Sequence, residues 1–445
     1  MRIILLQPPQ KTKKINGPPL GLAYVAACLE KNGHKVRIID TAALGYKLSD
    51  IKKEITKFNP EIIGISSTTK DIYKVFSIFK MSKENNPNCI NVLGGPHSTI
   101  RSIETLNECN DIDIIVRGEG EETFVELLEK KDQLEKVKGI TYRIKINKKI
   151  KKNPDRPFIS NLDKLPFPAY HLLPMKKYKI KFNLFEYTSI RALGAGFGAI
   201  STCRGCIYDC AFCSSKSLWG QKWRARSPEN VIEELSILRD KYNIRIIDFV
   251  DDTFTINKKR TEKICNLIKK EDIDISWICP TRADLFTKEI SQTLKKGKCS
   301  SIFFGLESGE QKTLDFLNKG ITIEQARQAV KNAKQSGFKI FSGFIIGVPG
   351  ETKQSCNKTI LFAKKLKLDV ASFSLLIPFP GTKIFEIAEK NNLLLSEDWS
   401  KYTGSYPLLK LKKINSNELK NLLFKAYLTF NFPIKNFLKS VKNIN

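Results

Sequence analysis

The chain has few histidines and lacks long apolar runs. Only three of its 445 residues are histidines, His34, His97 and His171, which argues against a histidine-based metal site or acid–base mechanism. No apolar segment reaches the roughly 20 residues needed to cross a bilayer, and the apolar amino terminus ends too soon for a secretory signal. The sequence therefore predicts a cytoplasmic protein, with contact to a membrane surface left open.

Acidic residues are scarce relative to basic ones. The 75 Lys and Arg residues against 46 Asp and Glu residues give a formal net charge of +29, which would suggest nucleic acid or an anionic membrane as a partner. The lysines are, however, spread along the whole chain, and no motif that reads nucleic acid accompanies them. This pattern favours a compositional bias, and we expect no nucleic-acid partner.

Eleven cysteines are present. In a long chain without a signal peptide they are expected to be thiols or metal ligands, not disulfides. Cys206, Cys210 and Cys213 form a C-x3-C-x2-C triad, which can hold three irons of a cubane cluster and leave the fourth iron open. A structural zinc or a closed cluster would take four ligands. Cys203 is therefore not expected to be a ligand, and the remaining cysteines are expected in the core.

Alternating apolar and helical segments predict an α/β fold with two sheets. The first set of strands is expected at 2–7, 35–40, 61–66, 90–94 and 113–117. Nearly continuous apolar strands separated by helices are typical of a parallel, doubly wound (Rossmann-like) sheet. The second set is expected at 199–202, 244–250, 275–279, 301–305, 339–346 and 371–377. Six βα units are too few for a closed eight-stranded barrel, so they predict a partial (β/α)6 barrel.

The same patterns suggest domain boundaries. We expect an amino-terminal domain at 1–135, a linker at 136–185, the barrel at 186–400 and a small helical region at 401–445. The linker is rich in proline, which disfavours helix. The carboxyl-terminal segment is basic and aromatic. It is expected to be an amphipathic helix packed on the barrel, a membrane-surface helix or a cover for the substrate.

The barrel region resembles the radical S-adenosylmethionine (SAM) superfamily. The triad directly follows the first expected barrel strand, and family-like motifs follow the later strands: Asp248-Phe-Val-Asp-Asp252, Pro280-Thr-Arg-Ala-Asp284, Gly305-Leu-Glu-Ser-Gly309 and Gly343-Phe-Ile-Ile-Gly-Val-Pro-Gly-Glu351. The resemblance implies a [4Fe-4S] cluster on the triad. It also implies SAM contacts from Phe212 beside the adenine, from Asp251 and Asp252 at the ammonium, from Arg282 at the carboxylate, from Glu307 near the ribose and amine, and from Gly347.

The amino-terminal region resembles a cobalamin-binding domain. The matching motifs are Pro18-Pro-Leu-Gly-Leu-Ala23, Gly64-Ile-Ser-Ser-Thr-Thr69, Gly94-Gly-Pro-His97 and Arg117-Gly-Glu-Gly-Glu121. Small residues let a bulky cofactor tail lie against the backbone, and the resemblance implies contacts from Ser66, Thr68, Gly94, Gly95, Gly118 and Glu119. Ala42 stands where many such domains carry a histidine below the cobalt, so a bound cobalt would lack that ligand. Loss of cobalamin binding is the alternative.

The resemblance implies a cobalamin-dependent radical SAM enzyme. Reductive cleavage of SAM at the [4Fe-4S] cluster would give a 5′-deoxyadenosyl radical, used for methyl transfer to an unactivated carbon of a small molecule, hydrophobic or anionic. An electron donor such as flavodoxin or ferredoxin is expected. One alternative is a radical oxidative cyclase or oxidoreductase that acts on a tetrapyrrole or lipid. Another is a non-enzymatic, basic cluster-binding protein. No catalytic acid or base is identified.

Overall fold

A computed structural model describes residues 1–9, 17–144, 146–179 and 196–431. The chain divides into two compact units. The first unit contains the described residues up to Val250 except 207–214. The second unit contains 207–214 and the described residues from Asp251 onward.

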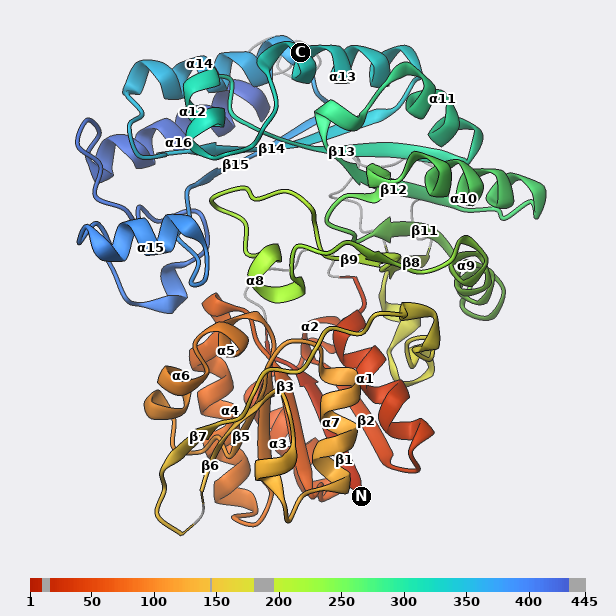
Figure 1. The fold of residues 1–445 in the computed structure, drawn as a ribbon, viewed down its shortest axis with the longest axis vertical. Coiled ribbons are helices and arrows are strands. Elements are labelled where there is room, and N and C mark those ends of the chain that lie inside the picture. Colours follow the sequence, from red (N-terminus) through yellow and green to blue (C-terminus); the bar gives the residue numbers. More distant parts are fainter. Residues whose placement is uncertain (10–16, 145, 180–195, 432–445) are drawn as a thin grey trace, which may run out of the picture. The chain divides into compact units, whose positions relative to one another are not determined.

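The first unit is built on a seven-stranded sheet with the order β2-β1-β3-β4-β5-β6-β7 (Figure 1). Its strands are β1 (Arg2–Gln7), β2 (Lys35–Asp40), β3 (Ile62–Ser66), β4 (Ile90–Gly94), β5 (Ile114–Val116), β6 (Ile140–Arg143) and β7 (Ile150–Lys152). The first five strands are parallel, and the last two add in antiparallel orientation. Because β1 pairs with both β2 and β3, the direction of strand succession reverses there. Ligands of doubly wound sheets bind beyond the carboxyl ends of strands at such a point.

Helices lie on both sides of this sheet (Figure 1). They are α1 (Leu20–Lys31), α2 (Thr41–Leu44), α3 (Leu48–Phe58), α4 (Ile72–Asn85), α5 (Pro96–Ile100), α6 (Ser102–Glu108) and α7 (Gly120–Glu129). Helix α1 packs beside α7, and α3 packs beside α4. Burial on both faces explains why central strands such as β1 carry an unbroken apolar run, in which Ile3, Ile4, Leu5 and Leu6 are at most 1% exposed.

The first unit also contains the start of the second sheet. Strand β8 (Gly196–Ile200) pairs in parallel with β11 (Ile244–Phe249), and α9 (Pro228–Tyr242) connects them. The Ser227 hydroxyl caps α9 by accepting a hydrogen bond from the Asn230 N–H at 3.2 Å, and Pro228 follows at the first helical position. Between β8 and α9 lie β9 (Cys203–Arg204), α8 (Ser215–Trp219) and β10 (Arg224–Ala225), with β9 and β10 antiparallel.

The second unit carries four parallel strands, paired in the order β15-β14-β13-β12. They are β12 (Ser276–Thr281), β13 (Cys299–Glu307), β14 (Lys339–Ile346) and β15 (Val370–Leu375). The helices are α10 (Lys258–Lys270), α11 (Lys288–Lys296), α12 (Gln311–Phe316), α13 (Ile323–Gln335), α14 (Lys353–Leu366), α15 (Lys383–Lys390) and α16 (Ser416–Asn431). Helices α10, α11, α13 and α14 lie on one side of these strands (Figure 1). The sequence predicts these strands, together with β8 and β11, as a partial (β/α)6 barrel.

The carboxyl-terminal aromatic segment is described only as far as residue 431. Helix α16 packs on β15 and α14, and the Tyr427 hydroxyl donates a hydrogen bond to the Phe373 carbonyl at 2.6 Å. Phe432 and Phe437, which belong to the same expected segment, lie outside the described residues. Within the described ranges, no helix combines the length and apolarity needed to cross a bilayer.

Candidate cofactor sites

The three cysteines of the triad differ from the other eight in exposure. Cys213 is exposed and Cys206 and Cys210 are half-buried, whereas all others, including Cys203 in β9, are buried. Cys206 belongs to the first unit, and Cys210 and Cys213 belong to the second. In the described part of the chain, no three His, Cys, Asp or Glu side chains gather around a position for a single ion. A cubane cluster does not need its ligands around one ion, because each cysteine binds a different iron.

The segment of the triad in the second unit is fixed through its backbone. The buried Ala211 donates its N–H to the Leu317 carbonyl at 2.8 Å and accepts the Ile384 N–H at 3.0 Å. The Cys213 N–H donates to the Cys210 carbonyl at 3.1 Å, which closes a turn between the two thiols. Phe212 packs against the apolar cluster around Ala211 and Leu317. The two cysteines are therefore presented from an anchored turn.

Two cations lie near Cys210. The Arg282 Nη1 is 3.9 Å from the Cys210 Sγ, and its guanidinium lies 3.5 Å from the centre of the Tyr208 ring. Burial alone would lower the pKa of Lys319, but Glu307 and Cys210 outweigh it and raise that pKa, so the side chain remains an ammonium. Cations beside a thiol favour the thiolate, which is the form that binds iron. The residues present thus fit an iron–sulfur cluster.

Some of the expected SAM contacts border one cavity in the second unit. This cavity of about 240 Å³ lies against β14 and β15 and is lined by Phe212, Glu307, Gly343 and Phe379, among others. Its combination of aromatic and aliphatic walls with a single carboxylate is suited to an adenosyl group carrying hydroxyls. Glu307 also accepts a hydrogen bond from the Lys319 Nζ at 2.9 Å. Phe212 and Glu307 therefore border the same cavity, and their contact with SAM stays a prediction.

The other expected SAM residues lie elsewhere in the second unit. The Arg282 Nε and Nη2 bond to Asp284 at 2.9 and 3.2 Å, and its Nη1 lies near the Cys210 Sγ. Asp251 is buried and Asp252 is exposed, and both follow Val250, the first residue after β11. The Gly347 N–H is taken by the Glu351 carboxylate at 2.9 Å. Binding of SAM by these four residues stays a prediction.

A glycine-rich cavity of about 270 Å³ opens at the carboxyl ends of the first sheet's strands. Five of the residues expected to contact cobalamin line it: Ser66, Gly94, Gly95, Gly118 and Glu119. Their contact with cobalamin stays a prediction. Thr68 is not among its lining residues, and its hydroxyl bonds to Asp71 at 3.1 Å.

The shape of this cavity depends on missing side chains. Gly95 has φ of +95°, and an added Cβ would lie 2.7 Å from the Ser67 backbone. At Gly21 and Gly118, an added Cβ would meet nothing within 4 Å and would occupy open space. A bulky cofactor tail needs such open space, which side chains would otherwise fill. The residues therefore fit cobalamin.

Ala42, which stands where many cobalamin-binding domains carry a histidine, is part of the short capped helix α2. The Asp40 carboxylate accepts hydrogen bonds from the N–H groups of Ala42 and Ala43, both at 3.1 Å, and from the Tyr178 hydroxyl at 2.7 Å. Gly45 ends α2 in the left-handed conformation. Asp40 thus caps α2, and the Ala42 methyl group offers no metal ligand.

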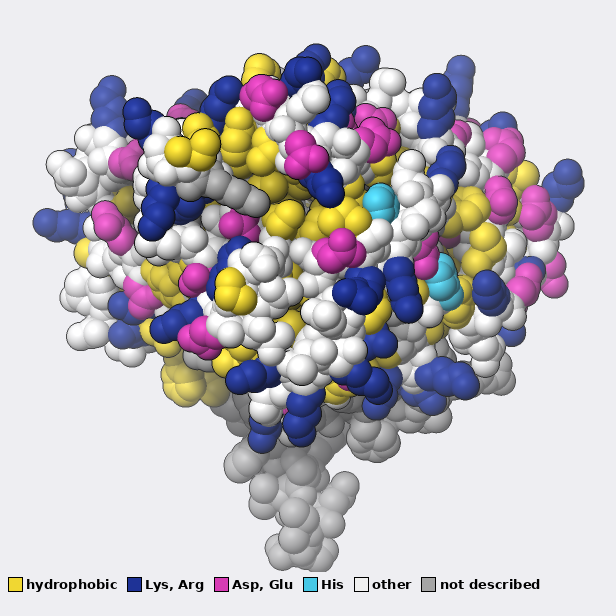
Figure 2. All heavy atoms as spheres, turned by 90° about the horizontal axis from the view of Figure 1, so that it is seen from below, with side chains coloured by type: hydrophobic (Ala, Val, Ile, Leu, Met, Phe, Trp, Pro, Cys, Tyr) yellow, Lys and Arg dark blue, Asp and Glu magenta, His cyan; other side chains and the backbone are white. Residues whose placement is uncertain are grey.

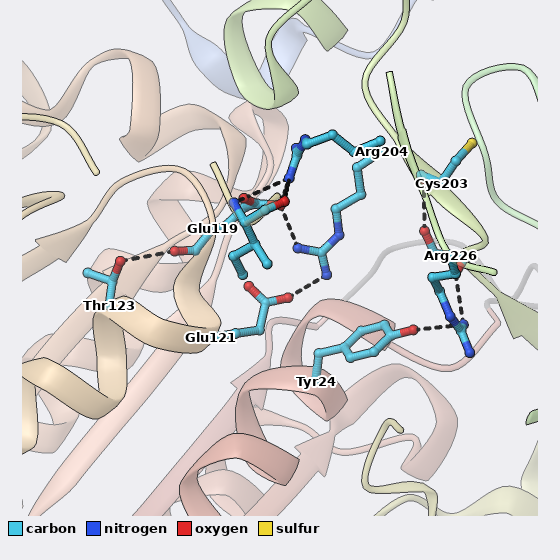
Figure 3. A network of polar contacts seen from close by, with 10 residues as sticks. Tyr24, Glu119, Glu121, Thr123, Cys203, Arg204 and Arg226 are labelled. Atoms are coloured by element: carbon cyan, nitrogen blue, oxygen red, sulfur yellow. Dashed lines mark hydrogen bonds and ion pairs between the residues drawn. The ribbon is translucent and has the colours of Figure 1, made fainter. Parts of the chain in front are cut away.

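The sequence did not predict a buried ionic network beside the glycine-rich cavity (Figure 3). The Glu119 carboxylate pairs with Arg204 at 2.7 Å and with Arg224 at 2.9 Å, and Glu121 pairs with Arg204 at 2.5 Å. All four side chains are at most 8% exposed. The Arg-Gly-Glu-Gly-Glu motif identified both carboxylates, but it gave no signal for partners more than 80 residues away.

Comparisons with known proteins agree with both resemblances. The family model for the radical SAM superfamily matches residues 200–363, and the model for the B12 binding domain matches residues 12–128. An uncharacterised methyltransferase of Pyrococcus horikoshii is 44% identical over an alignment of 449 residues, gaps included. The alignment covers 99% of this chain and 95% of that protein. The anaerobic magnesium-protoporphyrin IX monomethyl ester cyclase of Rubrivivax gelatinosus is 29% identical over 434 residues, covering 95% and 75%.

A solved structure gives the same fold. The radical SAM methyltransferase TsrM from Kitasatospora setae, with cobalamin and a [4Fe-4S] cluster bound, superposes with a TM-score of 0.75 at 17% identity. The match covers 96% of this chain and 90% of that one. These matches confirm the α/β fold class with a half-barrel.

Proposed function

Because this chain belongs to the radical SAM superfamily and carries a B12-binding domain at its amino terminus, we propose that it methylates an unactivated carbon of a small molecule. The observation that most strongly supports this proposal is the similarity, along 99% of the chain, to a protein named as a methyltransferase. The cyclase relative is less similar, at 29% identity, so transfer of a methyl group is favoured over ring formation.

The cofactors are a [4Fe-4S] cluster, SAM and cobalamin. When bound, the cluster and SAM supply a 5′-deoxyadenosyl radical, and cobalamin supplies a methyl group for transfer. In our proposal Cys206, Cys210 and Cys213 hold the cluster. The cavity bordered by Phe212 and Glu307 receives SAM, and the glycine-rich cavity receives the cobalamin tail.

The remaining roles follow from charge and shape. Arg282 and Lys319 keep positive charge at Cys210, which favours its thiolate. The aromatic and aliphatic side chains of the SAM cavity give its adenosyl group an apolar surface to pack on. The substrate is a small molecule, and a reduced electron-transfer protein such as flavodoxin or ferredoxin supplies the electron.

Cleavage of SAM by anaerobically reconstituted protein tests this proposal. The Cys210→Ala variant should lose cluster iron and release no 5′-deoxyadenosine, because two thiolates cannot hold three irons. Cys203→Ala is the matched control, since Cys203 is buried in β9 and lies outside the triad. It should keep both properties. Cleavage at the wild-type rate by Cys210→Ala, or none by wild type with cluster and reductant, would refute the proposal.

A further inference from the structure

The Glu119 carboxylate lines the glycine-rich cavity, but protein groups already occupy its acceptor positions. Its Oε1 accepts from Arg204 at 2.7 Å and from Arg224 at 2.9 Å. Its Oε2 accepts from Arg224 at 3.1 Å and from the Ile159 N–H at 2.7 Å. An ionised carboxylate has about four lone-pair sites. A cofactor amide could bond to Glu119 only by displacing one of these internal donors.

The two arginines stand at either end of one segment. Arg204 is in β9 and Arg224 is in β10, and these strands pair directly, with Arg204 opposite Arg224. The chain between them, residues 205–223, is the cysteine loop, because it carries Cys206, Cys210 and Cys213. Glu119 therefore joins both strands at the base of the cysteine loop to the start of α7 (Figure 3).

The cysteine loop also supplies part of the cavity wall. Leu218 and Trp219, in α8, line the cavity together with Glu119. The Arg204 guanidinium lies 5.3 Å from the centre of the Trp219 ring. Arg224 also donates to the Trp219 carbonyl at 3.3 Å and to the Ile159 carbonyl at 2.6 Å. The same two arginines thus contact the carboxylate and the cavity wall.

We propose that Glu119 is a positioning residue that fixes the base of the cysteine loop, and that ligand binding in the glycine-rich cavity orders residues 215–223 of this loop through Trp219. The inference rests on the proposed function only in taking cobalamin as that ligand. The buried ion pairs supply the rigidity, because charge-assisted bonds shielded from water resist opening. The loop is thereby ordered before a substrate arrives.

Amide hydrogen–deuterium exchange on the full chain with its cluster reconstituted tests this inference. The variant is Glu119→Gln, which keeps the shape and removes the charge. We expect exchange in 203–206 and 215–226 to accelerate by about tenfold, since losing a bond to a charged group shifts an opening equilibrium by at least that factor. Glu122→Gln is the matched control, because Glu122 lies on the same helix with its side chain 56% exposed. It should exchange like wild type.

A second variant keeps the test possible if the Glu119→Gln protein does not fold. Arg204→Lys keeps the charge but cannot bond to Glu119 and Glu121 at once through a planar fork, and it should accelerate exchange in the same peptides. Unchanged exchange in those peptides, in whichever of the two variants folds, would overturn the positioning role.

Hydroxocobalamin titrations separate this inference from the proposed function. Wild type should bind it, and binding should slow exchange in 215–226. Binding that leaves this exchange unchanged would overturn the coupling to Trp219 while the function stands. Failure of wild type to bind, with faster exchange in Glu119→Gln, would refute cobalamin as the ligand and still support the positioning role.

Discussion

At the scale of single residues, a buried charge pair lies at each of the two candidate cofactor sites. Glu307 and Lys319 form a buried pair in the second unit at 2.9 Å, and Glu119 and Arg204 form another in the first at 2.7 Å. A buried charge is tolerated only when it is paired, and removal of one partner costs about 3–5 kcal/mol. Glu307 therefore has a structural partner in addition to any cofactor contact. Glu119 has more structural partners than Glu307.

The buried His97 gives the first unit a specific sensitivity to acid. Its ring is 1% exposed, and its Nδ1 lies 3.3 Å from the Thr69 hydroxyl. Burial, followed by the nearby Arg101 cation, lowers the pKa of His97 from 6.5 to about 4. The folded state therefore binds fewer protons than the unfolded state between these values. The stability due to neutral His97 is complete above the unfolded pKa and is lost as the pH falls toward 4.

Urea unfolding at two pH values measures this contribution. Between pH 7 and pH 5, the unfolding free energy of wild type should fall by about 2 kcal/mol more than that of His97→Gln. His171→Gln is the control, because its side chain is 53% exposed, and it should follow wild type. An equal loss in wild type and in His97→Gln would show that His97 does not titrate in this way.

Sequence motifs identified single residues better than their partners. The triad, Phe212 and Glu307 follow from local patterns at strand ends, and the structure places Phe212 and Glu307 on one cavity. Lys319, Arg204 and Arg224 were missed because an isolated basic residue in a lysine-rich chain carries no local signal. Their roles depend on tertiary contacts that one sequence does not reveal.

At the scale of elements, apolar periodicity located the strands well. Each predicted strand exists, with ends that differ by three residues or fewer. The pairs β6–β7 and β9–β10 were not predicted. Strand β7 is a short, basic edge strand, and β9 and β10 have two residues each, so neither pair has enough residues for alternation to appear. The domain boundaries stay a prediction, and β6 and β7 lie within the expected linker.

Helix α1 offers a direct test of the glycine-rich cavity. Gly21 is exposed near the start of α1 and lines that cavity. Gly21→Leu should weaken hydroxocobalamin binding by about tenfold or more, because its side chain would occupy the cavity. Gly21→Ala is the matched control. It should bind nearly as wild type and should gain up to about 1 kcal/mol in unfolding free energy, since alanine favours helix. Unchanged affinity in Gly21→Leu would contradict this location for cobalamin.

At the scale of the whole molecule, the basic residues are dispersed along the sequence. Figure 2 shows Lys and Arg side chains spread over the face in view, interspersed with acidic and apolar groups. On this face, the arrangement agrees with the compositional explanation of the net charge of +29. A concentrated basic surface would instead indicate nucleic-acid binding.

The central claim is that the chain transfers a methyl group from SAM to a small molecule with the help of cobalamin. Its most direct test is mass spectrometry of a small-molecule extract incubated anaerobically with reconstituted protein, reductant, hydroxocobalamin and SAM carrying a deuterated methyl group. The account predicts a product that gains the deuterated methyl, formed with 5′-deoxyadenosine and only when hydroxocobalamin is present. A product that gains a ring or an oxygen atom without deuterium, released together with 5′-deoxyadenosine, would contradict it.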